Sequence, residues 1–380
     1  MVPRDLVSAN GLVATSGRLE RRLARLDRTR FDWSDAARAV AVLAIPIALG
    51  VSTDLVAAGV FAAIGGLNVL LLQATGDARQ RLLRSGYGWG LNTAMIAAGT
   101  LVGTLGWVEV PLVAVALTFV HLANRIPGSG SLSVTASVVF AIGVGLPGAS
   151  VAAAGMRAEL VFLGGGLAVV GLAAHCALLR SWARTLPADP PNAPGGAAPA
   201  PGALPEWPHA LAVGLTAAGG LALALSLGLA RDYWVILTVV VVLRARLDDT
   251  LETGAGRMVG TVLGAALGAV VTIAVAAFSV QGALLLAFVF AAFALQRANA
   301  VLYAVALTAF VIVLLNLVYP GGVLLAETRV LDTFIGGSLA MIASALLWYL
   351  RYRPSGPGSA PLFPIDGTGD RGPETPAPHR

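Results

Sequence analysis

The sequence has 380 residues, of which 57% are hydrophobic and only 12% charged, and its mean hydropathy is +0.81. A soluble domain of this length does not need so apolar a composition, which therefore indicates an integral membrane protein. The net charge of +5 does not indicate a nucleic-acid partner, because the basic residues are all Arg and lie beside apolar segments, the pattern that sets membrane topology.

Residues 1–34 form a polar, Arg-rich segment that we expect to stay in the cytoplasm. No secretory signal is visible in it, because no apolar run ends in a small-residue cleavage site. Leu19, Leu23 and Leu26 recur at helical spacing among Arg residues, which predicts a basic helix on the inner membrane surface. A frayed basic tail is an equally good interpretation.

Twelve apolar, nearly charge-free stretches follow, and most approach the roughly 20 residues that cross a bilayer as a helix. They lack the alternation of outer-membrane strands, so the predicted fold is an all-α membrane protein of about twelve transmembrane helices. The stretches are 36–52, 55–74, 86–106, 110–123, 132–151, 160–179, 210–230, 233–243, 258–278, 283–295, 301–318 and 330–350.

The distribution of Arg residues predicts the topology. If every stretch crosses and the N-terminus is inside, only Arg157, Arg231 and Arg329 of the inter-span Arg residues fall outside, in agreement with the positive-inside rule. We therefore predict a multi-pass protein of the inner (plasma) membrane with both termini in the cytoplasm.

Changes in composition divide the chain. Residues 185–207 are rich in Pro, Ala and Gly and are predicted to be a flexible linker, which separates a membrane repeat at 35–184 from a second at 208–352. Residues 353–380 have a similar composition and are predicted to be a disordered tail.

The two halves carry the same pattern in their last apolar stretch. Arg157 is followed by Phe-Leu-Gly-Gly at 162–165, and Arg329 by Phe-Ile-Gly-Gly at 334–337. This self-similarity and the equal number of stretches predict two six-helix repeats. Because six crossings restore the original orientation, the repeats should be parallel, with a pathway between them.

The second half also contains three short motifs, each near the start of an apolar stretch. They are Tyr233-Trp234-Val-Ile-Leu-Thr, Arg257-Met-Val-Gly260-Thr261-Val-Leu-Gly264 and Arg329-Val-Leu-Asp332-Thr-Phe-Ile-Gly336. Together, in this order, they resemble the fusaric acid resistance (FUSC) or aromatic acid exporter family. The resemblance covers about residues 208–350, and in the first half it is confined to the span architecture, Arg38, the loop at 76–81 and Arg157.

The resemblance implies an integral membrane transporter that expels aromatic carboxylic acids and uses the proton gradient. The related plant malate-channel family implies an anion path built from paired helical bundles.

Arg257 is the best candidate for binding an anion. A guanidinium near the bilayer centre costs roughly 2.5–3.5 kcal/mol, so it normally faces protein, water or an anion. Gly260 and Gly264 follow it, and with Gly336 they are assigned to close helix packing. The alternative is that Arg257 only anchors the cytoplasmic interface.

Arg38 and Arg329 have the same two interpretations, and Arg329 could instead pair with Glu327 or Asp332. Asp332 is the candidate proton-coupling residue, because a carboxyl group just inside a span is costly to keep charged. It could equally be a helix-start partner of Arg329.

Tyr233 and Trp234 begin the stretch 233–243, which is too short to cross a bilayer comfortably. Aromatic belts at membrane interfaces are one explanation of this pair. Short segments also mark transport sites, so an aromatic substrate could stack on Trp234 while its carboxylate meets Arg257. Thr261 completes the candidate substrate-binding set.

No enzyme is indicated, because the sequence has no Gly-rich phosphate loop, metal-ligand cluster or nucleophile elbow. The single Cys176 lies in an apolar stretch, and we expect no disulfide, metal or cofactor. The predicted function is export of small aromatic organic anions, with the lipid bilayer and the anion as partners and a homo-oligomer as an option. A passive anion channel and a non-transporting membrane scaffold are the alternatives.

Overall fold

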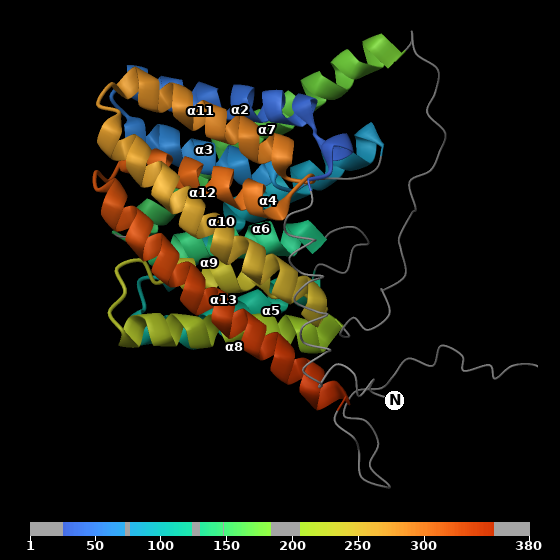
Figure 1. Ribbon diagram of the computed structural model, residues 1–380, viewed down its shortest axis with the longest axis vertical. Helices are drawn as coiled ribbons and strands as arrows, with labels where there is room; N and C mark the ends of the chain where they lie inside the picture. The colour runs from blue at the N-terminus through green and yellow to red at the C-terminus, as the bar shows by residue number, and fades with distance from the viewer. Residues whose placement is uncertain (1–25, 73–76, 124–129, 147, 184–205, 353–380) are drawn as a thin grey trace, which may run out of the picture.

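The computed structural model describes residues 26–72, 77–123, 130–146, 148–183 and 206–352. These residues form twelve α-helices and two 3₁₀ helices, and they contain no strand. The predicted all-helical fold is therefore confirmed for this part of the chain. The helices run side by side as one bundle (Figure 1).

The helices follow one another in chain order with short connections. In the first half they are η2 (Arg28–Arg30), α2 (Trp33–Ser52), α3 (Val56–Leu70), α4 (Ala78–Val102), η3 (Gly106–Val108), α5 (Glu109–Ala123), α6 (Gly130–Gly145) and α7 (Val151–Ala183). In the second half they are α8 (Glu206–Ser226), α9 (Tyr233–Val242), α10 (Leu247–Ala274), α11 (Phe278–Leu295), α12 (Ala300–Asn316) and α13 (Gly322–Tyr352).

Seven helical segments are long and apolar enough to cross a membrane, judged by length and composition. They are α2, η3 with α5, most of α7, α8, α10, α11 and α13, whereas α3, α6, α9 and α12 provide shorter apolar helices of 10–17 residues. Several membrane-spanning helices are thus present, and twelve crossings remain a prediction.

Side-chain caps fix where several helices begin. The Asp32, Asp77 and Asn299 side chains accept hydrogen bonds from backbone amides three residues later, at 3.0, 2.7 and 2.8 Å, at the starts of α2, α4 and α12. Asp232 accepts from the Tyr233 amide at 2.7 Å at the start of α9. Local sequence therefore sets these boundaries.

The helices alternate in direction, so their ends gather at two opposite ends of the bundle. At one, which we call the Asp35 end, Arg81 of α4 approaches Asp35 of α2 to 4.0 Å. At the other, which we call the Asp232 end, the start of α5 lies near the loop before α9, where Glu109 and Asp232 line one cavity. The predicted topology would place the Asp35 end in the cytoplasm.

Four helices begin well before their apolar stretches: α4 at Ala78, α7 at Val151, α10 at Leu247 and α13 at Gly322, against stretches that begin at 86, 160, 258 and 330. Arg257 and Arg329 therefore lie about two to three turns inside their helices, not at the helix starts. Hydropathy marks the apolar part of a helix and misses its polar first turns. In α10 these turns contain Asp248 and Asp249, which the helix dipole favours at an N-terminus.

Corresponding helices pack alike in the two halves. In the first half α4 packs on α6 and α7, and α3 packs on α2 and α7; in the second, α10 packs on α12 and α13, and α9 packs on α8 and α13. Contacts between the halves join α2 to α11 and α5 to α8, at opposite edges of the bundle (Figure 1), and join α6 to α9. The cavity described below is lined from both sides of this last contact.

The similarity extends to single residues. A Cβ at Gly164 of α7 would collide with the Ala62 carbonyl of α3, and a Cβ at Gly336 of α13 would lie 2.7 Å from the Val235 carbonyl oxygen of α9. Glycine thus allows the same close approach at matching positions.

The predicted non-membrane segments fall mostly outside the described residues. Residues 1–25 of the N-terminal segment, 185–205 of the predicted linker and the whole tail at 353–380 are among them. The last two residues of the predicted linker, Glu206 and Trp207, belong instead to the first turn of α8.

Candidate functional site

The helix α9 is short and surrounded by protein. Eight of its ten residues are buried, and it packs on α6, α8, α10 and α13. At 1.5 Å per residue it is about 15 Å long, half of a hydrocarbon core. It is therefore too short to cross a bilayer by itself, and the ends of such a short helix can face a ligand.

A cavity of about 440 Å³ runs along α9, and we call it the α9 cavity. Its lining extends from Tyr233 at the start of the helix to Arg244 just beyond its end. Helices α3 and α6 contribute from the first half, and α9, α10, α12 and α13 from the second. The described lining contains three guanidiniums, those of Arg244, Arg257 and Arg329, and no carboxylate.

Two of these guanidiniums have buried nitrogens that lack a hydrogen-bond acceptor in the described part of the chain. Arg257 and Arg329 are 8% and 3% exposed. Within the described residues, Nε of Arg257 and both Nε and Nη1 of Arg329 have no hydrogen-bond acceptor. A buried cation without acceptors is costly, and a bound carboxylate would supply them. The cavity is therefore suited to an anion.

Aromatic side chains stand beside the cations. Tyr233 and Trp234 are each 3% exposed, with ring centroids 5.8 Å apart in an edge-to-face arrangement. The guanidinium carbon of Arg329 lies 4.8 Å from the Trp234 ring centroid, a cation–π contact. The structure thus brings together Arg257, Arg329, Tyr233 and Trp234, four of the predicted substrate-binding residues.

Thr261 and Asp332 are buried nearby and do not line the α9 cavity. Thr261 is fully buried and Asp332 is 1% exposed. Their Oγ1 and Oδ2 atoms have no hydrogen-bond partner among the residues described. Gly260 and Gly264 face α12, where a Cβ at Gly260 would lie 2.8 Å from the Val301 carbonyl oxygen. The substrate role of Thr261 and the coupling role of Asp332 remain predictions.

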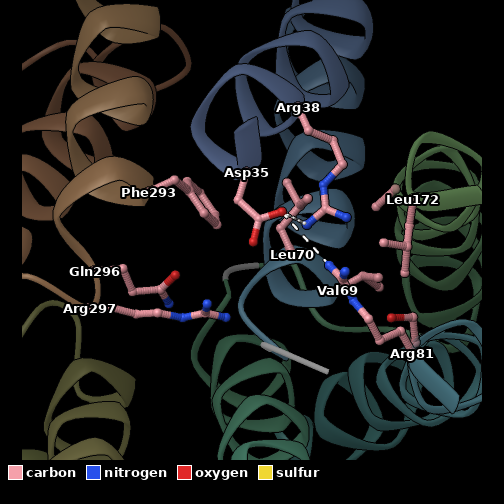
Figure 2. A pocket seen from close by; sticks show the side chains of 11 residues that line it. Asp35, Arg38, Val69, Leu70, Arg81, Leu172, Phe293, Gln296 and Arg297 are labelled. Carbon is pink, nitrogen blue, oxygen red and sulfur yellow. Dashed lines mark ion pairs between the residues drawn. The ribbon is translucent and has the colours of Figure 1, made fainter. Parts of the chain in front are cut away.

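Arg38 does not join this group. It lies at the Asp35 end, where its Nη2 is 2.8 Å from Asp35 Oδ1, and it lines a separate pocket of about 30 Å³. Figure 2 shows Asp35 between Arg38 and Arg81, with Arg297 and Gln296 approaching from the second half. Arg38 therefore forms an ion pair with a carboxylate, whereas the described lining around Arg257 and Arg329 contains none.

A second ion pair at the same end joins the two halves. Arg297 Nη1, between α11 and α12, lies 3.6 Å from Asp32 Oδ2. Burial acts to raise the pKa of Asp32, but the hydrogen bonds from Asp35 and Ser34 and the charge of Arg297 outweigh it, so the pKa lies below its usual value. Asp32 is thus held as a carboxylate at this end.

Sequence reasoning missed the contribution of the first half to the cavity. Asn68, Ser131 and Thr135 line it with polar groups. Asn68 is 2% exposed, its Nδ2 donates to the Ile64 carbonyl at 2.9 Å, and its Oδ1 has no partner in the described part of the chain. An Asn in an apolar stretch is costly to bury, which is the one signal that could have identified it.

Residues 217–343 match the family model described as fusaric acid resistance protein-like. This segment of the chain is therefore similar to that family. The segment that matches the fusaric acid resistance protein-like family includes Trp234, Arg257 and Arg329, so the match falls on the half that supplies the cations of the cavity. With the apolar helices, it indicates a multi-pass membrane protein of transporter type. No curated protein and no solved structure matches the chain.

Proposed function

We propose that this protein exports small aromatic organic anions across the inner (plasma) membrane and binds them in the α9 cavity. One observation carries the proposal: the charged groups of the described lining are guanidiniums alone, and two of them are buried with unpaired nitrogens. The volume of about 440 Å³ suits a small molecule.

In the proposed complex the carboxylate lies between Arg257 and Arg329 and the aromatic ring lies against Trp234. Two cations in one buried site repel each other, and an anion between them replaces that repulsion with attraction. The indole contributes a large apolar face. These contacts favour an aromatic acid over an inorganic anion.

The proposed pathway follows the seam between two parallel six-helix repeats. The matching helix contacts in the two halves and the matching positions of Gly164 and Gly336 support such a repeat. The α9 cavity is lined by both halves, so rocking of one against the other would change access to it.

The proposed transport runs out of the cytoplasm and is coupled to protons. Arg38, Arg81 and Arg297 line one pocket at the Asp35 end, which supports a cytoplasmic location for that end and for both termini. Asp332, one turn from Arg329 and buried, is proposed to carry the coupling proton. The role is transport, without catalysis or a cofactor.

The test is counterflow of labelled benzoate, followed by a panel of aromatic carboxylates, in proteoliposomes. We expect saturable exchange that responds to a pH gradient. Arg257→Gln should weaken benzoate binding by about 100-fold, because one buried partner of a charged pair is lost. Arg246→Gln is the control, since Arg246 is 38% exposed and pairs with Asp249 at 3.9 Å.

Current without counterflow would favour a passive channel. If no carboxylate binds or moves, or if Arg257→Gln leaves binding unchanged, the proposed function or its site, respectively, is wrong.

A further inference from the structure

A second cavity, of about 570 Å³, lies at the Asp232 end, and we call it the vestibule. Its charged lining residues are Glu109, Arg231 and Asp232, and they are joined by Tyr319 and Thr328. Loops and helix ends of both halves form its walls. Leu146 is shared with the α9 cavity, so the two cavities adjoin.

Tyr233 and Trp234 stand between the two cavities, and we call them the aromatic barrier. Both line the α9 cavity, whereas Gly145, on the other side, lines the vestibule. A Cβ at Gly145 of α6 would collide with the Tyr233 side chain, so the two are in direct contact. Tyr233 of the barrier therefore packs directly against α6 at the seam between α6 and α9.

The indole of Trp234 has a guanidinium near it in each cavity. Arg329, which lines the α9 cavity, lies 4.8 Å from the ring centroid, and Arg231, which lines the vestibule, lies 5.5 Å from it. Arg231 is also 5.3 Å from the Tyr319 ring centroid, and it is half-buried. The Trp234 ring thus lies near one cation of the α9 cavity and one cation of the vestibule.

We propose that Arg231 forms a second binding site for aromatic carboxylates, which receives the anion from Arg329 when the aromatic barrier opens. The proposal rests on the proposed transport function. An anion that leaves two buried cations for water must cross a high free-energy barrier. A third cation, just beyond Trp234, divides that step into two smaller ones.

The vestibule also explains how the anion could then leave. Glu109 and Asp232 line it together with Arg231, whereas the described lining of the α9 cavity has no carboxylate. Nearby negative charge weakens binding of an anion, so the vestibule site should be the weaker of the two. A strong site followed by a weak one favours release at the Asp232 end.

The experiment compares Arg231→Gln, Arg231→Lys and wild type in two measurements with labelled benzoate. One is equilibrium binding to the purified full-length protein, and the other is counterflow in proteoliposomes. For Arg231→Gln we expect affinity within about twofold of wild type and counterflow slowed by about tenfold, with partial recovery in Arg231→Lys because the charge is retained. Arg246→Gln should behave as wild type in both.

A second variant tests the barrier without removing a charge. Gly145→Ala should displace the Tyr233 side chain. Labelled benzoate loaded into proteoliposomes of this variant should therefore leak into benzoate-free buffer about tenfold faster than from wild-type proteoliposomes. A thermal unfolding curve checks that the variant is folded.

Several results would overturn the inference. If Arg231→Gln loses affinity for benzoate as strongly as Arg257→Gln, the two residues belong to one binding site. If counterflow by Arg231→Gln equals that of wild type, Arg231 has no role in transport. In both cases wild-type counterflow leaves the proposed function intact. If wild type neither binds nor moves benzoate, both proposals are wrong.

Discussion

Arg157 of α7 and Arg329 of α13 hold matching positions in the two halves, and each lies over an aromatic ring of the neighbouring helix. The guanidinium of Arg157 is 5.8 Å from the Phe61 ring centroid, and that of Arg329 is 4.8 Å from the Trp234 centroid. Both are nearly buried, at 5% and 3% exposed. The same frame of helices therefore holds a cation beside an aromatic ring twice.

Their other neighbours differ. Arg157 Nη1 donates to Thr100 Oγ1 at 3.3 Å, whereas Nε and Nη1 of Arg329 have no acceptor in the described residues, and Arg329 lines the α9 cavity. One guanidinium is thus part of the packing and the other is open to a ligand. Arg residues at matching positions of the two halves therefore differ in the hydrogen-bond acceptors around them, and this difference is the basis for proposing different roles.

The largest expected difference is between Arg329→Gln and Arg157→Gln. Arg329→Gln should weaken benzoate binding by about 100-fold, because a buried cation that contacts the anion is lost. Arg157→Gln should leave the affinity for benzoate within about twofold of wild type. It should lower the melting temperature, because it removes a hydrogen bond between two helices of the bundle. Equal losses of affinity, measured by equilibrium binding, would break the comparison.

The matching glycines should respond alike. Gly164→Ala and Gly336→Ala each force a methyl group toward a backbone carbonyl of the neighbouring helix, so each should lower stability by about 1–3 kcal/mol. Thermal unfolding in detergent measures this effect. Gly219→Ala in α8 is the control, because a Cβ there meets nothing within 4 Å. A loss in only one half would contradict the repeat.

The smallest expected difference concerns the aromatic rings. Trp234→Leu should reduce affinity for benzoate by about fivefold more than for cyclohexanecarboxylate, which has a similar size but no π-system. Phe61→Leu should not change this ratio, because Phe61 does not line the α9 cavity. Competition binding with both acids gives the ratio directly, and an unchanged ratio in Trp234→Leu would remove the proposed ring contact.

Part of this site could be predicted from the sequence. The cost of burying Arg257 and the shortness of the stretch that begins at Tyr233 both pointed to the residues that line one cavity. Thr261, one turn after Arg257, is buried but does not line this cavity. Arg38 is separate because it lies near the start of α2 at the Asp35 end, where it forms an ion pair with Asp35.

Other features depend on packing that hydropathy does not encode. Asn68 and Thr135 reach the cavity only because α3 and α6 of the first half lie beside α9 of the second, a contact between residues far apart in the chain. Arg231 was assigned to a loop by the charge rule, and only the fold places it beside Trp234. The all-helical class, in contrast, follows directly from long apolar stretches that lack the alternation of strands.

The shortness of α9 has a consequence for how the protein is made. The insertion machinery releases segments into lipid according to their own apolar length, and about 20 residues are normally required. A ten-residue helix that is covered by protein on nearly every side falls short of this. We expect α9 to enter the bilayer only as a hairpin with α8 or α10 and to settle once the other helices have assembled around it.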